Sequence, residues 1–453
     1  MGTIIEGAEG LFTGRREAPR AKGAIRYEAG IITHVGDVVA APGDTIIDAS
    51  GCVIYPGLVN THHHLAQSML KAIPAAIDLP VTEWLVEVPY RYWRKLDEAT
   101  FRLAATIGMV ELLLSGATTI ADHHYIYSPD LGYDPSEILF EIAASLGLRF
   151  VLCRGSATRP SRLSAQGAVG VPAETIAQTL DTIAALAQRF HQSGPGSMRK
   201  VVLAPTNLIW SVEPQDIRDL SREGRALGLR LHSHLSEAPG DVAHCLQTRG
   251  LRPVHYAAQN DFVGDDVWFA HLVHVDDAEL NLLVETGTGM AHCPQSNARL
   301  GSGIAPAPKL AALGGRVTIG VDGAASNEAA DMISEMHSAW HLHRTGGRPD
   351  AVRVEDVVSW SSVNGARMLG FEDTGSLEPS MAADIAVFDL SQPRYAGLHD
   401  PLIGPVVSAG SAQMRRLVIA GADIVVDGII PGLDLGNLAR DARRGIARLI
   451  DQN

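Results

Sequence analysis

Residues 229–237 read LRLHSHLSE, an apolar run that turns polar at its carboxyl end. Seven other stretches share this design, and together the eight span residues 52–324. Short, near-continuous apolar runs are typical of strands buried on both faces, as in a parallel sheet. The other seven are CVIYPGLVNTH (52–62), ATTIADHH (117–124), LRFVLCRGS (148–156), KVVLAPTN (200–207), VWFAHLVH (267–274), TGMAHCPQSN (288–297) and RVTIGVDGA (316–324).

Helical patterns occupy the segments between these runs, for example Ala99–Ser115, Pro172–Phe190 and Asp276–Thr286. Strand, helix and strand in regular succession indicate βαβ units. Eight such units predict an α/β protein with a (β/α)8 TIM barrel, whose active site lies at the carboxyl ends of the strands. A doubly wound open sheet is the alternative. It is disfavoured because no G-x-G-x-x-G turn follows the first run.

Two hairpin-rich flanks frame the barrel. Residues 1–57 contain GAIRYEAGIITHVGD, and residues 371–453 contain MRRLVIAGADIVVDG, both alternating patterns with glycine turns. We therefore expect the barrel over residues 58–370 and one small β-sandwich assembled from both ends of the chain. The stretch Leu435–Ile450 predicts an amphipathic terminal helix.

Composition narrows the class of protein. The 453 residues carry a formal net charge of −14 and no basic stripe, so we expect neither a nucleic-acid partner nor a membrane surface. The four cysteines lie far apart, and the first residues lack the design of a signal peptide. Together these features predict a cytoplasmic protein.

The histidines concentrate at the polar ends of the runs. Scattered core or surface histidines would not favour one end of each strand, whereas a barrel brings those ends together around one mouth. Ten of the 18 fall there, namely His62, His63, His64, His123, His124, His232, His234, His271, His274 and His292.

Two of the runs place paired imidazoles on one face of a strand. Alternate residues of an extended strand share a face, so His62 and His64 point the same way and His63 points the other. The same alternation pairs His232 with His234, of which His234 lies nearer the mouth. Imidazole nitrogens suit a borderline-soft divalent cation such as zinc.

Carboxylates follow two of the strands. Glu237 stands where the chain leaves the 229–237 run, and Asp322 ends the apolar part of the 316–324 run. Each has a simpler interpretation, a carboxylate at a helix N-terminus for Glu237 and a turn residue for Asp322. With His271 and His292 at two further strand ends, however, they complete a set of nitrogen donors, a carboxylate and a free acid–base group.

The series NTHHH, HLSE, AH, HCPQSN and GVDGAASN resembles the amidohydrolase superfamily, in its branch of cytosine and guanine deaminases and chlorohydrolases. The resemblance covers nearly the whole chain, including GLVNTH before the barrel and AADIAVFDL after it. It implies one divalent metal ion, with zinc expected and Fe²⁺ as the alternative. The implied ligands are His62, His64, His234 and Asp322.

The resemblance also implies roles in proton transfer. Glu237 would shuttle protons, His271 would hold the attacking water, and Asp322 would help the second proton to the leaving ammonia. Two-metal members carry a carboxylated lysine at the end of strand four, where this chain reads LAPTN (203–207). Because Lys200 lies at the start of that strand, we expect a single-metal site and deamination rather than hydrolysis of a cyclic amide.

Five residues are candidates for binding the substrate. In the resemblance, Gln67 contacts a carbonyl and amide edge, and a carboxamide offers the donor and acceptor that such an edge needs. Trp84 lies in the long loop after the first strand, where it stacks on a flat ring or else fixes that loop to the barrel. A solvent-facing position is the alternative for Gln67. Tyr125, His292 and Asn297 are further candidates for the pocket lining.

The stretches NTHHHLAQS, VPYRYWRKLDE and ADHHYIYSPD favour one substrate class within the branch. They are most similar to enzymes that convert isoxanthopterin and water to 7-hydroxylumazine and ammonia, with 8-oxoguanine as the alternative substrate. Guanine itself is disfavoured, because Thr206-Asn207 replaces the arginine of guanine deaminases, and we expect a pocket without an arginine clamp. Chlorotriazine hydrolysis and a metal-free assembly role stay open, and we expect a homo-oligomer.

Overall fold

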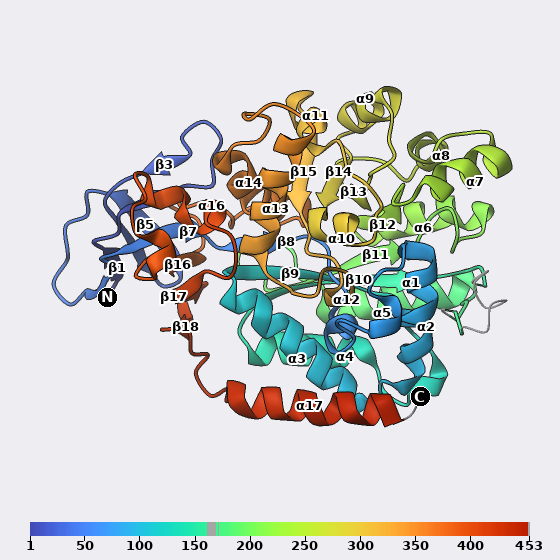
Figure 1. Ribbon diagram of the computed structural model, residues 1–453, viewed down its shortest axis with the longest axis horizontal. Helices are drawn as coiled ribbons and strands as arrows, with labels where there is room; N and C mark the ends of the chain where they lie inside the picture. The colour runs from blue at the N-terminus through green and yellow to red at the C-terminus, as the bar shows by residue number, and fades with distance from the viewer. Residues whose placement is uncertain (161–168, 171, 452–453) are drawn as a thin grey trace.

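Eight parallel strands curve into a barrel in the computed structural model, which describes residues 1–160, 169–170 and 172–451 (Figure 1). The strands follow one another around the sheet in chain order. The last returns to the first, where Thr61 N donates to Ile319 O at 3.1 Å. The predicted (β/α)8 barrel is therefore confirmed. Its strands are β8 (Leu58–Asn60), β9 (Ala117–His124), β10 (Arg149–Ser156), β11 (Arg199–Pro205), β12 (Leu231–Leu235), β13 (Val267–His271), β14 (Gly289–His292) and β15 (Arg316–Ile319).

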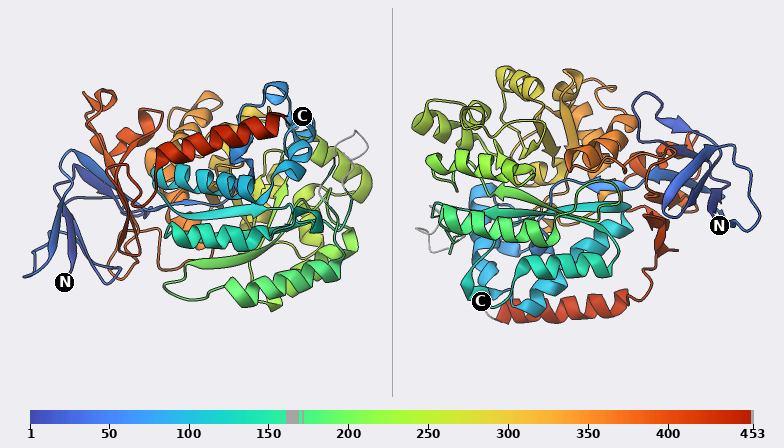
Figure 2. Two further views of the ribbon diagram at one scale, coloured as in Figure 1. Left: turned by 90° about the horizontal axis from the view of Figure 1, so that it is seen from below. Right: turned by 180° about the vertical axis from the view of Figure 1, so that it is seen from behind.

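Helices fill the connections and cover the outside of the barrel (Figures 1 and 2). Helix α3 begins where Asp97 Oδ1 accepts the Thr100 N–H at 2.8 Å, a helix cap. The three helical patterns expected from the sequence are present as α3, α5 and α9. The helices are α1 (Val81–Glu87), α2 (Pro89–Tyr92), α3 (Glu98–Leu114), α4 (Pro135–Ser145), α5 (Ile176–Phe190), α6 (Pro214–Ala226), α7 (Pro239–Arg249), α8 (Pro253–Gln259), α9 (Asp277–Thr286), α10 (Pro294–Arg299), α11 (Ala307–Ala312), α12 (Ala324–Asn327), α13 (Met332–Thr345), α14 (Val354–Trp360) and α15 (Val363–Met368).

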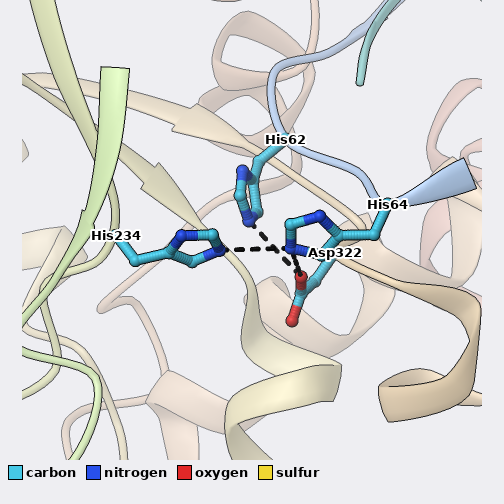
Figure 3. Close-up of side chains that lie close together, drawn as sticks. All are labelled: His62, His64, His234 and Asp322. Atoms are coloured by element: carbon cyan, nitrogen blue, oxygen red, sulfur yellow. Dashed lines mark hydrogen bonds and ion pairs between the residues drawn. The ribbon is translucent and has the colours of Figure 1, made fainter. Parts of the chain in front are cut away.

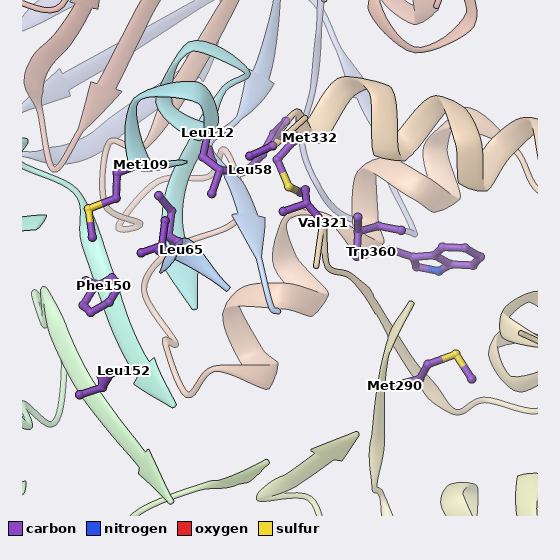
Figure 4. Packing of buried hydrophobic residues seen from close by; sticks show 14 of the residues in the cluster. Leu58, Leu65, Met109, Leu112, Phe150, Leu152, Met290, Val321, Met332 and Trp360 are labelled. Carbon is purple, nitrogen blue, oxygen red and sulfur yellow. The ribbon is translucent and has the colours of Figure 1, made fainter. Parts of the chain in front are cut away.

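Apolar side chains fill the layer between strands and helices. Leu58 of β8, Leu112 of α3 and Met332 of α13 are fully buried there (Figure 4). Inside the barrel, Trp268 and the small side chains of alternate strand positions form a separate cluster with Phe371, which follows α15. This packing closes the amino-terminal end of the barrel and leaves the carboxyl end for function.

The two ends of the chain build one β-sandwich. Its two sheets have the orders β5-β4-β1-β6 and β18-β17-β16-β7-β2-β3. Strand β7 from the N-terminal segment pairs with β16 from the C-terminal segment, with Ile54 opposite Val387, so the predicted assembly is confirmed. The strands are β1 (Thr3–Glu6), β2 (Gly10–Phe12), β3 (Arg20–Ala21), β4 (Ala24–Glu28), β5 (Ile31–Gly36), β6 (Thr45–Asp48), β7 (Cys52–Pro56), β16 (Ile385–Asp389), β17 (Gln413–Ile419) and β18 (Ala422–Val426).

The first predicted strand, residues 52–62, is in fact two strands in different sheets. β7 belongs to the sandwich and β8 to the barrel, and the chain crosses between them at Gly57. A Cβ at Gly57 would lie 2.3 Å from Thr118 Oγ1, so the crossing needs a residue without a side chain. An unbroken apolar run conceals this change of sheet. The division of the chain at residue 57 stays a prediction.

The C-terminal segment ends in the helix α17 (Leu435–Asp451), which lies along α3 (Figure 2). Gly445 and Leu449 are buried, whereas Arg443 and Arg444 on the outer face are exposed. The predicted amphipathic terminal helix is therefore confirmed. Among the helices that the structure describes, none is both long enough and apolar enough to cross a bilayer.

A buried ion pair joins the barrel to the C-terminal segment. Arg149, the first residue of β10, is fully buried, and its Nε lies 2.8 Å from Asp384 Oδ2 just before β16. Replacing one partner leaves an uncompensated buried charge. We therefore expect Asp384→Ala to lower the free energy of unfolding by about 3–5 kcal/mol.

Chemical denaturation measures this effect. The matched control is Asp423→Ala, because Asp423 pairs with Arg416 on the surface with 43% of its side chain exposed. An exposed pair contributes at most about 1 kcal/mol. Equal shifts of the unfolding midpoint in the two variants would contradict the assignment of a special role to the buried pair.

Candidate active site and metal centre

Four side chains from three distant parts of the chain meet at the barrel mouth (Figure 3). His62 and His64 follow β8, His234 lies in β12, and Asp322 follows β15. Their ligand atoms all lie within 4.8 Å of one another. His64 Nε2 is 3.1 Å from His234 Nε2 and 3.2 Å from Asp322 Oδ1, which is also 3.4 Å from His62 Nε2. The structure thus brings together the four residues predicted as ligands.

The alternation expected along NTHHH holds. His62 and His64 both turn toward Asp322, while His63 turns away and its Nδ1 donates to the backbone carbonyl of Asp322. The middle histidine therefore fixes the backbone of the residue whose carboxylate its neighbours face. This contact also joins β8 to the end of β15 across the barrel seam.

Backbone acceptors fix the tautomers of two of these rings. His64 Nδ1 lies 2.7 Å from the His123 carbonyl, and His234 Nδ1 lies 2.6 Å from the Thr206 carbonyl. A carbonyl oxygen only accepts, so each Nδ1 carries a hydrogen. In the neutral rings each Nε2 then presents a lone pair to the site.

A second imidazole does the same for His62. His232 Nδ1 donates to the Trp268 carbonyl at 2.9 Å, which makes His232 Nε2 an acceptor. His62 Nδ1, 2.9 Å away, must then donate to it. His62 Nε2 is fully buried and has no hydrogen-bond partner within the described part of the chain. It is therefore a third bare nitrogen.

Three lone pairs and a carboxylate that face one another require a cation between them. Asp322 Oδ2 accepts hydrogen bonds from Ser296 Oγ at 2.5 Å and Ser326 Oγ at 3.1 Å, which leaves Oδ1 for the site. Three imidazoles and one carboxylate are a donor set that zinc accepts. The residues present thus fit a divalent ion.

Backbone strain concentrates at the same mouth. Ser236, His271 and Asp322 all adopt the left-handed region, with φ of 53°, 73° and 61°. Residues other than glycine are uncommon there, and the strain persists where surrounding contacts enforce it. Each of the three lies at the end of a barrel strand or within three residues after it.

Glu237 and His271 lie beside the four candidate ligands. Glu237 Oε2 is 3.7 Å from His271 Nε2, and His271 Nδ1 donates to Asn297 Oδ1 at 2.9 Å. Burial raises the pKa of Glu237 to about 7, the range that suits a group which both takes and gives a proton. The side chain thus faces the site. The backbone N–H groups before α7 are bound by Asp241 instead, so the alternative role of a helix-capping carboxylate falls to that residue.

A cavity of about 500 Å³ opens above these side chains. Three of the predicted substrate-binding residues, Gln67, Trp84 and Tyr125, line it. Gln67 Nε2 donates to the Tyr125 hydroxyl at 3.3 Å, so its carboxamide is not solvent-facing. Trp84 combines both of its expected roles, because its indole N–H binds the Ala325 carbonyl at 3.2 Å while its ring forms part of the wall.

His292 and Asn297 lie behind the wall of this cavity rather than in it. His292 Nε2 is 3.0 Å from His343 Nε2 of α13, and Asn297 holds the ring of His271. Their positions at or after a strand end did not reveal this. Successive side chains of β14, which ends at His292, turn to opposite sides, and Asn297 lies further on in α10.

Sequence reasoning missed most of the wall, including several of its polar and aromatic residues. Asn207 and Trp210 follow β11, Asp241 lies in α7, and Arg159 follows β10. Arg159 lines the cavity, and its Nε lies 3.9 Å from Glu213 Oε1. The expectation of a pocket without an arginine clamp on the substrate stays a prediction. Arg159 stands three residues after the end of a predicted strand, and that placement was the available signal.

Lys200 lies where the sequence placed it, at the start of β11. Its ammonium group sits 4.8 Å from the centre of the Phe371 ring, near the amino-terminal end of the barrel. The carboxyl end of the same strand is formed by Leu203, Ala204 and Pro205, none of which could bind a metal ion through its side chain.

The barrel, with imidazoles and a carboxylate converging at its mouth, is the architecture of a metal-dependent hydrolase. Comparison of the sequence with known families makes the assignment specific. The chain belongs to the amidohydrolase family, whose sequence profile matches residues 53–425.

Individual relatives cover nearly all of the chain. It is 46% identical over 468 aligned residues to an isoxanthopterin deaminase from an unknown prokaryotic organism, covering 99% of this chain and 97% of that protein. It is 37% identical to an 8-oxoguanine deaminase from Pseudomonas aeruginosa, covering 95% of each. Among solved structures, an amidohydrolase from an environmental sample of the Sargasso Sea superimposes with a TM-score of 0.87 at 43% identity, covering 100% of this chain and 99% of that one.

Proposed function

We propose that this chain is a metal-dependent deaminase that converts isoxanthopterin and water to 7-hydroxylumazine and ammonia. The observation that carries the proposal is that Glu237 and His271 lie beside four converging donor atoms, and that a cavity of about 500 Å³ adjoins them. The 46% identity to an isoxanthopterin deaminase over nearly the full length of both chains supports the choice of substrate.

One divalent ion, with zinc expected, would be held by His62, His64, His234 and Asp322. When bound, it supplies Lewis-acid chemistry that lowers the pKa of a water from 15.7 to about 7. A single ion is favoured because the end of β11 offers no side chain to bridge a second one. Fe²⁺ is the alternative ion, and metal analysis of the purified protein distinguishes the two.

The side chains divide the proton transfers among them. Glu237 takes a proton from the attacking water and delivers it to the ring nitrogen beside the amino-bearing carbon. His271 Nε2, whose other nitrogen is held by Asn297, orients that water. As the carbon–nitrogen bond breaks, Asp322 helps pass the second proton to the leaving ammonia. The balance is one water consumed and one ammonia released, with a ring carbonyl in place of the amino group.

Gln67 is proposed to recognise the amide edge of the heterocycle. We expect Gln67→Ala to raise KM about five- to tenfold with a small change in kcat, since a hydrogen bond contributes about 1 kcal/mol. Steady-state kinetics with the preferred substrate measure this. Gln259→Ala on the exposed end of α8 is the control. A fall in kcat with unchanged KM would contradict a role in binding.

An oxopurine is the second candidate substrate. 8-Oxoguanine and isoxanthopterin share an aminopyrimidinone edge, and the relative with 37% identity is named an 8-oxoguanine deaminase. A panel of aminopterins, 8-oxoguanine, guanine, cytosine and chlorotriazines, assayed with zinc-loaded protein for ammonia and chloride, separates the candidates. We expect the highest kcat/KM with isoxanthopterin. Absence of ammonia with each aminoheterocycle would refute the proposal.

The homo-oligomeric state and the cytoplasmic location stay predictions from the sequence. Measurement of molar mass in solution by light scattering tests the first.

A further inference from the structure

Asp241 holds three donors with one carboxylate. Its Oδ2 accepts the N–H groups of Glu237 at 2.8 Å and Ala238 at 3.2 Å. Its Oδ1 accepts the indole N–H of Trp210 at 2.8 Å. Asp241 is only 6% exposed, so these bonds are shielded from competing water. One side chain thus connects the loop after β11 with the loop after β12.

Trp210 makes two contacts with α7, one through its indole N–H and one through the face of its ring. Its ring stacks on His244 with centroids 4.0 Å apart and planes inclined by 14°, while its N–H binds Asp241. Asp241 and His244 are three residues apart in α7, so they share one face of the helix. The same indole also forms part of the cavity wall, where it is available to contact the substrate.

The backbone of Glu237 lies between two regular elements and belongs to neither. β12 ends at Leu235, Ser236 adopts a φ of 53°, and α7 begins at Pro239. The Glu237 N–H therefore donates to a side chain rather than to a strand or helix ladder. Movement of Asp241 would change where the Glu237 carboxylate lies relative to His271.

Stabilisation of the helix start is the simpler explanation for Asp241. A carboxylate at the third position of a helix commonly binds the N–H before the first turn. That role requires only the bond to Ala238. It accounts neither for the bond to Glu237 nor for the bond to Trp210.

We infer that Asp241 is a positioning residue that fixes Glu237 relative to the Trp210 wall of the cavity. The inference rests on the proposed proton-shuttle function of Glu237. Its physical basis is that a displacement of about 1 Å in a reacting group lowers the rate about 10²-fold. Because Asp241 also binds the Trp210 indole, a substrate that contacts Trp210 would affect the position of Glu237.

Three variants test the separate contributions of the hydrogen bonds that Asp241 accepts. Trp210→Phe keeps the aromatic face against His244 but removes the donated N–H. Asp241→Asn keeps an acceptor for the backbone but turns an amide NH₂ toward Trp210. Asp241→Ala removes all three bonds. We expect kcat to fall about tenfold in the first two and about 10²-fold in the third, with unchanged zinc content.

The decisive measurement combines Asp241→Ala with Glu237→Gln. If Asp241 acts through Glu237, its removal lowers kcat no more than about twofold in the Glu237→Gln background. Two losses that multiply in full would overturn the inference. If Glu237→Gln alone keeps full kcat, the proposed function fails instead, so the two failures are distinguishable.

Asp276→Ala is the matched control for a helix cap. The Asp276 carboxylate accepts the Glu279 N–H at 2.9 Å at the start of α9, away from the candidate active site. We expect this variant to lower Tm without changing kcat. An equal drop in Tm for Asp276→Ala and Asp241→Ala, together with equal kcat values, would overturn the inference in favour of capping alone.

Discussion

Replacing Glu237 with glutamine should lower kcat by about 10²–10⁴-fold while leaving the metal content unchanged. Glutamine keeps the size of the side chain but cannot take a proton from water, and general acid–base transfer contributes a factor of this order. Glu237 is not among the four converging donors, so its carboxylate is not needed to hold the ion. Kinetics with zinc-loaded protein and metal analysis of the same sample provide the two readings.

The pH dependence of the native protein follows from the same group. Burial raises the pKa of Glu237 to about 7. The reaction begins with the deprotonated carboxylate, so protonation removes the base and kcat/KM should fall as the pH is lowered below 7. The positive charge of a bound ion favours the carboxylate and moves this fall further toward acid.

Glu335→Gln is the matched control for Glu237→Gln. Glu335 of α13 is fully buried and accepts the Gln295 N–H at 2.9 Å, and it does not line the cavity. Burial raises the pKa of Glu335 well above its usual value. Glutamine keeps a side-chain oxygen that can accept the Gln295 N–H. We expect near-native kcat. A native rate for Glu237→Gln with full zinc content would reject Glu237 as the proton shuttle.

Replacing His234 with alanine should abolish both metal binding and turnover. Three imidazoles and one carboxylate complete the coordination expected of a zinc site, and a missing imidazole leaves too few ligands to retain the ion. The bound zinc, about one ion per chain in the native protein, should fall close to zero after dialysis. The contrast with Glu237→Gln, which loses turnover but not metal, separates the ligand from the proton shuttle.

His232→Phe should give a graded effect between these extremes. Phenylalanine keeps the stack on Trp268, whose ring centroid lies 4.5 Å from that of His232, but it removes the acceptor for His62 Nδ1. Loss of such a supporting hydrogen bond lowers metal affinity about 10–100-fold. Competition with a chelator measures the affinity. His34→Ala on the exposed strand β5 should bind zinc as the native protein does; weakening there would show that the assay reports general instability.

The sequence could predict the barrel and the meeting of the four donors because both depend on short-range regularities. Strand alternation turns His62 and His64 to one side, and parallel connection of successive strands brings His234 and Asp322 to the same rim. The structure has both features.

Features that depend on loop paths were not predictable. Arg159 and Trp210 follow different strands, and their place in the cavity wall depends on how their loops fold back over the rim. The double role of residues 52–62 was also concealed, because apolar side chains satisfy the core of either sheet. The apolar runs in the sequence also extend past the observed ends of the strands. For example, the 288–297 run leaves β14 at His292 and enters α10 at Pro294.

The interlacing of the two chain ends has a consequence for biosynthesis. Strand β7 pairs with β16, and the guanidinium of Arg149 binds Asp384. In each pair the second partner is synthesised more than 200 residues after the first. A ribosome-bound chain that has emerged only as far as the last barrel strand therefore exposes an open sheet edge and an unneutralised cation. Messages truncated before codon 384 should yield polypeptides that chaperones retain and proteases remove.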